Sequence, residues 1–94
     1  MPSNQINAIL LQNKDNVITT IDSITRGEQV YYQKEGKTLD IRVVDDIPRF
    51  HKISLVEIQP REPVYKYGEL IGEASRYIPQ GSHVHDHNIR SPQR

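Results

Sequence analysis

The feature that most constrains the fold is a six-residue step between two aliphatic residues that occurs four times. The steps join Ile24 to Val30, Ile47 to Ile53, Ile58 to Val64, and Ile78 to Val84. A short turn that places one aliphatic side chain in a core, reverses the chain, and returns the second aliphatic residue on a strand accounts for this spacing. The pattern therefore predicts many short strands joined by tight turns.

The residue types inside the steps fit this interpretation. Gly27 and Gly81 occupy the third position after the first aliphatic residue in two copies, where glycine tolerates a positive φ. A proline closely follows the first aliphatic residue in three copies, and its fixed φ helps a turn to begin. Phe50 and Arg61 replace glycine in the other two copies, so we expect those turns to differ in detail or to carry strain.

The segments between the turns favour extended structure. Residues 17–21 are β-branched almost throughout, and residues 29–33 and 37–43 flank a Lys-Glu-Gly turn as a hairpin. Further strands are expected at residues 6–11, 51–55, 64–67, 70–75 and 83–88, and no amphipathic helix is seen. The sequence predicts one compact all-β domain of six or seven short strands over residues 6–90, with flexible ends at residues 1–5 and 91–94.

Composition excludes several classes of function. Twelve basic and twelve acidic residues cancel without long runs of either sign, which removes the electrostatic case for nucleic acid or a membrane surface. The absence of cysteine excludes disulfides, thiolate metal sites and cysteine nucleophiles. No signal-peptide pattern or long apolar run is found, so a cytoplasmic protein is expected. The length of 94 residues favours an accessory domain or subunit over an enzyme acting alone.

Three of the four histidines alternate along residues 83–88. In an extended strand, His83, His85 and His87 would lie on one face. Neutral imidazole binds first-row metals and also serves as an acid or base. The stretch therefore predicts a metal or substrate contact at these three histidines. A solvated strand end near the terminus, with no such function, is the open alternative.

Two shorter polar features also qualify as binding residues. His51 and Lys52 directly follow a Pro-Arg-Phe turn and could bind a carboxylate, although strand ends near turns are commonly solvated. Lys66 lies between Tyr65 and Tyr67, where it could face a ligand or extend into solvent while both rings pack. Both interpretations stay open for each feature.

Several separated segments together resemble the N-terminal SAF domain of the altronate dehydratase family. They are Asp15-Asn16-Val17, His51-Lys52, Lys66-Tyr67-Gly68, Ile71-Gly72 with Ala74, and residues 78–88. Their order and spacing hold over residues 6–90, which is nearly the whole chain. The resemblance implies the β-clip fold of SAF domains, in agreement with the repeated turns. Phe50, and Pro60-Arg61-Glu62, depart from the family pattern, so we expect those two turns to differ from it in local shape.

The resemblance also implies an activity. Family members eliminate water or sulfite from a sugar acid or another 2-hydroxy acid, and their large catalytic part is missing here. The chain would then be the small subunit, or an excised domain, of a lyase, capping the active site of a large catalytic subunit. A divalent metal, iron in this family, would be held mainly by that partner.

The site residues implied by this reading are His51, Lys52 and Lys66 toward the substrate or a proton, with His83, His85 and His87 as metal contacts. A stand-alone SAF-type binding or chaperone module without catalysis is the competing function, so whether the chain takes part in an enzyme is left open. An exposed sheet edge could also pair with a second copy of the chain.

Overall fold

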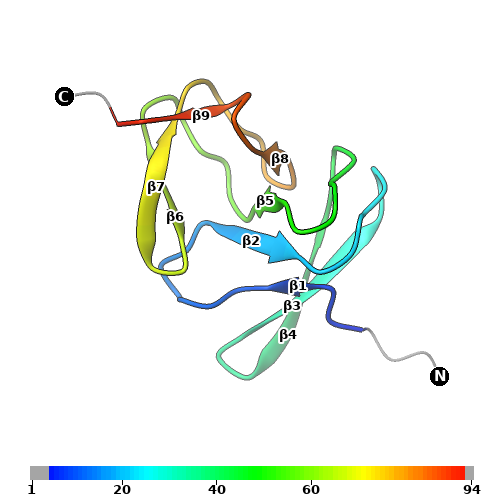
Figure 1. Cartoon of the computed structure of the whole chain (residues 1–94). Helices are drawn as coiled ribbons and strands as arrows, with labels where there is room; N and C mark the ends of the chain where they lie inside the picture. Colours follow the sequence, from blue (N-terminus) through cyan, green and yellow to red (C-terminus); the bar gives the residue numbers. More distant parts are fainter. Residues whose placement is uncertain (1–4, 93–94) are drawn as a thin grey trace.

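A computed structural model describes residues 5–92, and every strand pair in this range is antiparallel (Figure 1). Residues 1–4 and 93–94, which belong to the flexible ends predicted from the sequence, lie outside the described range. Between residues 5 and 92 there is no helix of the length and apolarity needed to cross a membrane.

Nine short strands form three small sheets in the described part of the chain. The first sheet has the order β1 (Ala8–Ile9), β2 (Val17–Thr20), β5 (Lys52–Ser54) and β8 (His83–Val84). The second is the hairpin of β3 (Gln29–Lys34) and β4 (Lys37–Arg42). The third has the order β6 (Pro63–Lys66), β7 (Glu69–Ala74) and β9 (Ile89–Arg90). The all-β prediction is confirmed, although the described residues form nine strands rather than six or seven, and β1, β8 and β9 span only two residues each.

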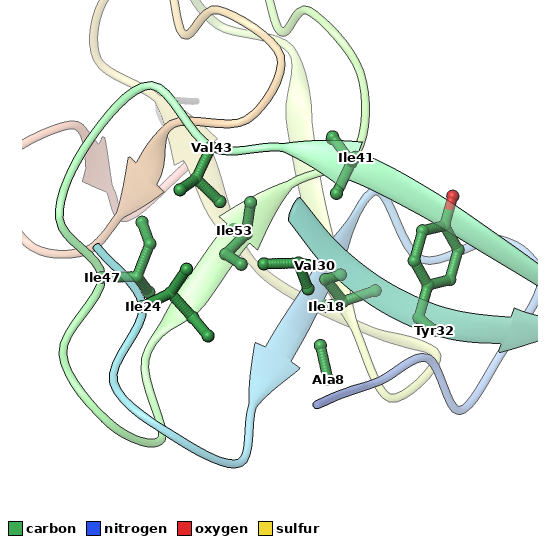
Figure 2. Close-up of a cluster of buried hydrophobic side chains, with 9 residues drawn as sticks. All are labelled: Ala8, Ile18, Ile24, Val30, Tyr32, Ile41, Val43, Ile47 and Ile53. Carbon is green, nitrogen blue, oxygen red and sulfur yellow. The ribbon is translucent and has the colours of Figure 1, made fainter. Parts of the chain in front are cut away.

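The four six-residue steps combine into two structural halves. All eight of their aliphatic side chains are buried. Ile24 pairs with Ile47, and Ile58 with Ile78, through isolated antiparallel bridges. One apolar cluster contains the first two steps, as Figure 2 shows, and a second cluster contains the other two. The sequence repeat therefore corresponds to a repeated unit of structure, each unit with its own core.

The turns inside the steps share one backbone conformation. The third position has a positive φ in all four copies: 92° at Gly27, 67° at Phe50, 73° at Arg61 and 84° at Gly81. Phe50 and Arg61 therefore adopt the glycine-like conformation, which costs an L-residue roughly 1–2 kcal/mol. The strain expected at these two positions is present because the antiparallel pairing of the two steps within each half, rather than the local residue type, fixes the turn.

A polar clasp ties the β6–β7 hairpin to the loop between β1 and β2. The buried carboxylate of Asp15 accepts hydrogen bonds from the backbone N–H groups of Tyr67 at 2.8 Å and Gly68 at 2.7 Å. Both donors have positive φ, so their N–H groups form a concave anion nest. Asn16 adds a bond from its Nδ2 to the Pro63 carbonyl at 2.8 Å. The clasp thereby fixes the end of β6, which carries Lys66.

Two alanine substitutions should separate backbone strain from steric exclusion at the turns. Gly27 and Gly81 both have positive φ, but a Cβ on Gly81 would collide with the Arg42 carbonyl oxygen, whereas a Cβ on Gly27 meets nothing within 4 Å. We expect Gly27→Ala to lower the free energy of unfolding by about 1 kcal/mol and Gly81→Ala by about 2–4 kcal/mol. Urea unfolding measures both, and equal losses would contradict the steric argument.

Candidate functional site

The histidine-rich stretch begins as a strand and continues as a turn. Strand β8 covers only His83–Val84, and the N–H groups of Asn88 and Ile89 then both donate to the His85 carbonyl, at 3.0 and 3.1 Å. The prediction of one extended strand over residues 83–88 is therefore wrong. The turn nevertheless gathers the rings, because the His83 centroid lies 5.8 Å from that of His85 and 5.1 Å from that of His87.

Two residues without a predicted role hold this turn. The buried Asn88 accepts the His85 backbone N–H through Oδ1 at 3.0 Å and donates from Nδ2 to the His83 carbonyl at 2.9 Å. Asp45, in the connection between β4 and β5, accepts the His83 backbone N–H at 3.0 Å. Asn88 lay inside the predicted stretch, whereas no sequence signal links Asp45 to a histidine 38 residues away. Both missed residues fix the histidine backbone rather than the rings.

His51 lies beside the rings of His83 and His85, although it follows the turn that contains Phe50. It precedes β5, whose Ile53 is paired with His83 of β8. The Nδ1 atom of His51 lies 2.8 Å from the Nε2 atom of His83, and the His51 ring stacks on His85 with centroids 4.4 Å apart. One ring nitrogen from each of His51, His83 and His85 lies within 4.8 Å of the other two. We call these three residues the histidine cluster; His87 is exposed and lies outside this group of nitrogens.

The surroundings keep His51 and His83 largely uncharged. Desolvation lowers the pKa of His83 to about 4, with further contributions from the charges of His87, His51 and His85, and Asp45 acts weakly in the opposite direction. Desolvation also lowers the pKa of His51, assisted by His85 and Lys52. Both imidazoles are therefore neutral near pH 7, the form that binds a metal or accepts a proton.

Two lysines form a cationic region next to the cluster. Lys52 is half-buried at the start of β5, and its pKa is lowered first by desolvation and then by the charge of Lys66, with Asp86 acting in the opposite direction. The Lys66 ammonium lies 4.8 Å from the centroid of the Tyr67 ring. Because of this cation–π contact, the Lys66 side chain does not simply extend into solvent. A carboxylate placed between Lys52 and Lys66 would offset their mutual repulsion.

All six residues predicted from the sequence thus occupy one neighbourhood. Ring contacts connect His51 to His83 and His85, and they connect His83 to His87. Electrostatic interactions connect Lys52 to His51 and to Lys66. Neutral imidazoles beside two ammonium groups can bind an anion, move a proton or ligate a metal ion. The chemical roles of these residues stay predictions.

Comparison with known proteins extends over almost the whole chain. Residues 6–92 match the family described as the altronate/galactarate dehydratase SAF domain. The chain is 37% identical to altronate dehydratase of Bacillus subtilis (strain 168) over 83 residues, which are 88% of this chain and 16% of that protein. It is 30% identical to (2R)-sulfolactate sulfo-lyase subunit alpha of Chromohalobacter salexigens over 76 residues, which are 79% of this chain and 81% of that subunit. Altronate dehydratase of Escherichia coli (strain K12) is 36% identical over 77 residues, 82% of this chain and 15% of that protein.

Acid should destabilise the fold through His83. Its pKa is about 4 in the folded chain against an ordinary value of 6.5, so the unfolded chain binds more protons between these values. The contribution of His83 to the stability of the fold is complete above pH 6.5 and is lost as the pH falls toward 4. We expect a loss of about 1–2 kcal/mol after allowance for partial solvent exposure.

Urea unfolding of the wild-type chain and His83→Asn at a series of pH values tests this prediction. The variant should lose part of the pH dependence. His87→Asn is the matched control and should retain most of it, because desolvation rather than the charge of His87 is the largest cause of the shift. Parallel pH profiles for the wild-type chain and His83→Asn would contradict the assignment.

Removal of the Asn88 side chain should loosen the turn. Asn88→Ala leaves the His85 N–H and the His83 carbonyl without their partner, and each lost, partly buried hydrogen bond costs about 1 kcal/mol or more, so we expect a total of about 2–3 kcal/mol. Asn13→Ala removes only an exposed bond to Glu35 and should cost less than about 0.5 kcal/mol. Urea unfolding compares the two variants, and a similar loss in both would exclude Asn88 as the support of the turn.

Proposed function

Because the chain belongs to the altronate/galactarate dehydratase SAF domain family, we propose that it is the small, non-autonomous part of a lyase. In this proposal the lyase removes water or sulfite from a sugar acid or another 2-hydroxy acid, and its catalytic machinery lies on a separate large polypeptide. The supporting observation is the share of each relative's length that the chain covers. It matches 81% of a sulfo-lyase subunit alpha but only 16% of an altronate dehydratase. The cytoplasmic location expected from the sequence belongs to the same proposal.

Lys52 and Lys66 would bind and orient the substrate carboxylate. An elimination of this type removes the proton next to a carboxylate and expels the leaving group from the next carbon, so negative charge develops on the carboxylate. Preorganised cations that face this charge provide the main stabilisation of such a transition state. The lowered pKa of Lys52 supports the assignment, because burial and repulsion by Lys66 leave a site that favours an anion.

His51 would hold or move a proton beside that carboxylate. Its lowered pKa, caused by desolvation, keeps the ring neutral and able to accept a proton near pH 7. The 2.8 Å contact from its Nδ1 to Nε2 of His83 gives it a hydrogen-bond partner that fixes the ring. A neutral, oriented imidazole next to two ammonium groups matches the needs of proton transfer at an acid substrate.

The divalent metal implied by the family resemblance, iron, is assigned mainly to the large polypeptide. When bound, such an ion would stabilise the developing charge on the carboxylate as a Lewis acid. This chain's own donors fit an ion of that kind, because His51 and His83 have lowered pKa values and Nδ1 of His85 is buried without a hydrogen-bond partner. A ligand from among His83, His85 and His87 remains part of the proposal.

The exposed surface next to the cluster supports a partner that covers it. Phe50 immediately precedes His51, and 61% of its surface is exposed. Its ring is held in a positive-φ turn, with the Arg49 guanidinium 4.7 Å from the ring centroid. A large aromatic side chain kept in a strained turn beside a polar site is suited to contact with another polypeptide. The large catalytic polypeptide would bury Phe50 and close the site from solvent.

Turnover by the assembled complex tests the proposal. The chain should co-purify with a large polypeptide, and only the complex should release water from altronate or sulfite from sulfolactate. Lys66→Met should raise KM and lower kcat/KM about 10- to 100-fold, because it removes one charged hydrogen bond to the carboxylate. His51→Asn should lower kcat with a smaller change in KM.

Lys37→Met is the matched control, because Lys37 is an exposed residue of β4 outside the candidate site. It should leave turnover unchanged. Unaltered turnover in both Lys66→Met and His51→Asn would refute the proposed roles. A chain that functions with no large partner would instead support the stand-alone SAF-type binding or chaperone module.

A further inference from the structure

The histidine cluster has the spacing of a small metal site. The three ring nitrogens lie within 4.8 Å of one another, and the closest pair, Nδ1 of His51 and Nε2 of His83, is 2.8 Å apart. A tetrahedral ion with metal–nitrogen distances of about 2.0–2.1 Å requires ligand nitrogens roughly 3.3–3.4 Å apart. The observed separations therefore bracket the required one, and rotations of the side chains are enough to reach it.

The donor set selects the kind of ion. The cluster offers three imidazoles and no carboxylate, a combination that suits Zn²⁺, Fe²⁺ or Co²⁺ and disfavours Mg²⁺ and Ca²⁺. Nδ1 of His85 is buried and makes no hydrogen bond to any described residue, so ligation through this atom would break no existing bond. Between His51 and His83, a metal ion would replace the hydrogen bond that now joins them.

The backbone around the cluster is fixed before any ion arrives. His83 is held through β5–β8 pairing and through Asp45, and the His85 N–H is held by Asn88. The three rings lie within 30° of parallel, so binding requires them to rotate until their lone pairs converge. This rotation is confined to side chains and gives the bound state a distinct signature at the ring resonances.

The charged neighbours determine what completes the coordination. Lys52 next to His51 opposes a cation, while Asp45 next to His83 and Asp86 next to His85 favour one. Lys66 lies close enough to Lys52 to lower its pKa, so the two ammonium groups together favour an anion at the edge of the cluster. An ion with three histidine ligands keeps a coordination position open, as in catalytic zinc sites, and a carboxylate would be drawn to it.

We propose that His51, His83 and His85 form a binding site for a divalent ion of the zinc type, with one position open to a carboxylate ligand. The ligand set differs from the one predicted from the sequence, because His51 takes the place of His87. The inference goes beyond the proposed function, in which the metal belongs mainly to the large polypeptide, and it does not depend on that function. In the metal-bound state His51 is a ligand, so its proposed proton-transfer role applies to the metal-free ring.

Calorimetric titration of the full chain with Zn²⁺ at pH 7.5 tests the site. We expect one ion per chain with micromolar affinity, and an affinity at least about 10-fold lower in His51→Asn, His83→Asn and His85→Asn. His87→Asn is the matched control and should stay within about threefold of the wild-type chain. Urea unfolding without metal establishes that each variant is folded.

Two measurements on the wild-type chain need no variant. Co²⁺ should give the visible absorption bands of a low-coordinate nitrogen site, and added acetate should alter them by occupying the open position. Addition of Zn²⁺ should shift the ring resonances of the histidine cluster more than those of His87. Absence of saturable one-to-one binding up to about 1 mM Zn²⁺ would overturn the proposal. Equal losses of affinity in His87→Asn and His85→Asn would overturn the assigned ligand set.

Discussion

The geometry of the candidate site depends on Ser54, a fully buried polar residue that locks β5 to the last of the four turns. Its backbone N–H donates to the Ser82 carbonyl at 3.0 Å, and its carbonyl accepts the Gly81 N–H at 2.9 Å. Its hydroxyl donates to the Pro79 carbonyl at 2.6 Å and accepts the Ser82 N–H at 3.0 Å. Because a buried polar group without partners is costly, this set of bonds defines a single register, and that register places His51 next to His83.

The repeated turn explains why the site lies where the two structural halves meet. His51 and Ser82 each follow the positive-φ residue of their turn, and Lys52 and His83 come one position later. Equivalent backbone positions in the two halves thus supply different side chains to the paired strands β5 and β8 of the first sheet. The fold provides two similar backbone frames, and the residue types that fill them make this strand pair basic and rich in imidazole.

Regular features were predictable from the sequence because they repeat locally. The spacing of the aliphatic residues predicted the buried positions, and glycine in two copies predicted the reversal that all four copies share. The path of residues 83–88 was mispredicted, because alternating histidines favour a strand but the Asn88 side chain closes a turn. The contact of Asp45 with His83 could not be predicted, because it depends on chain pairing over 38 residues. His51 entered the prediction through the family resemblance, which implied one pocket shared with His83 and His85, whereas the residue pattern by itself gave no distance between His51 and His83.

The cationic region formed by Lys52 and Lys66 lies next to two neutral rings, those of His51 and His83. Burial lowers the pKa of His51 and His83, so near neutral pH these rings add no charge and the lysines supply the positive potential. The charged form of Lys52 is destabilised in this arrangement, because its ammonium is desolvated and lies near that of Lys66. A carboxylate would relieve that destabilisation whether it is held by the lysines alone or also by an ion on the histidine cluster. Exclusion of water by a covering polypeptide would strengthen either interaction, since electrostatic attraction increases as the surrounding dielectric falls.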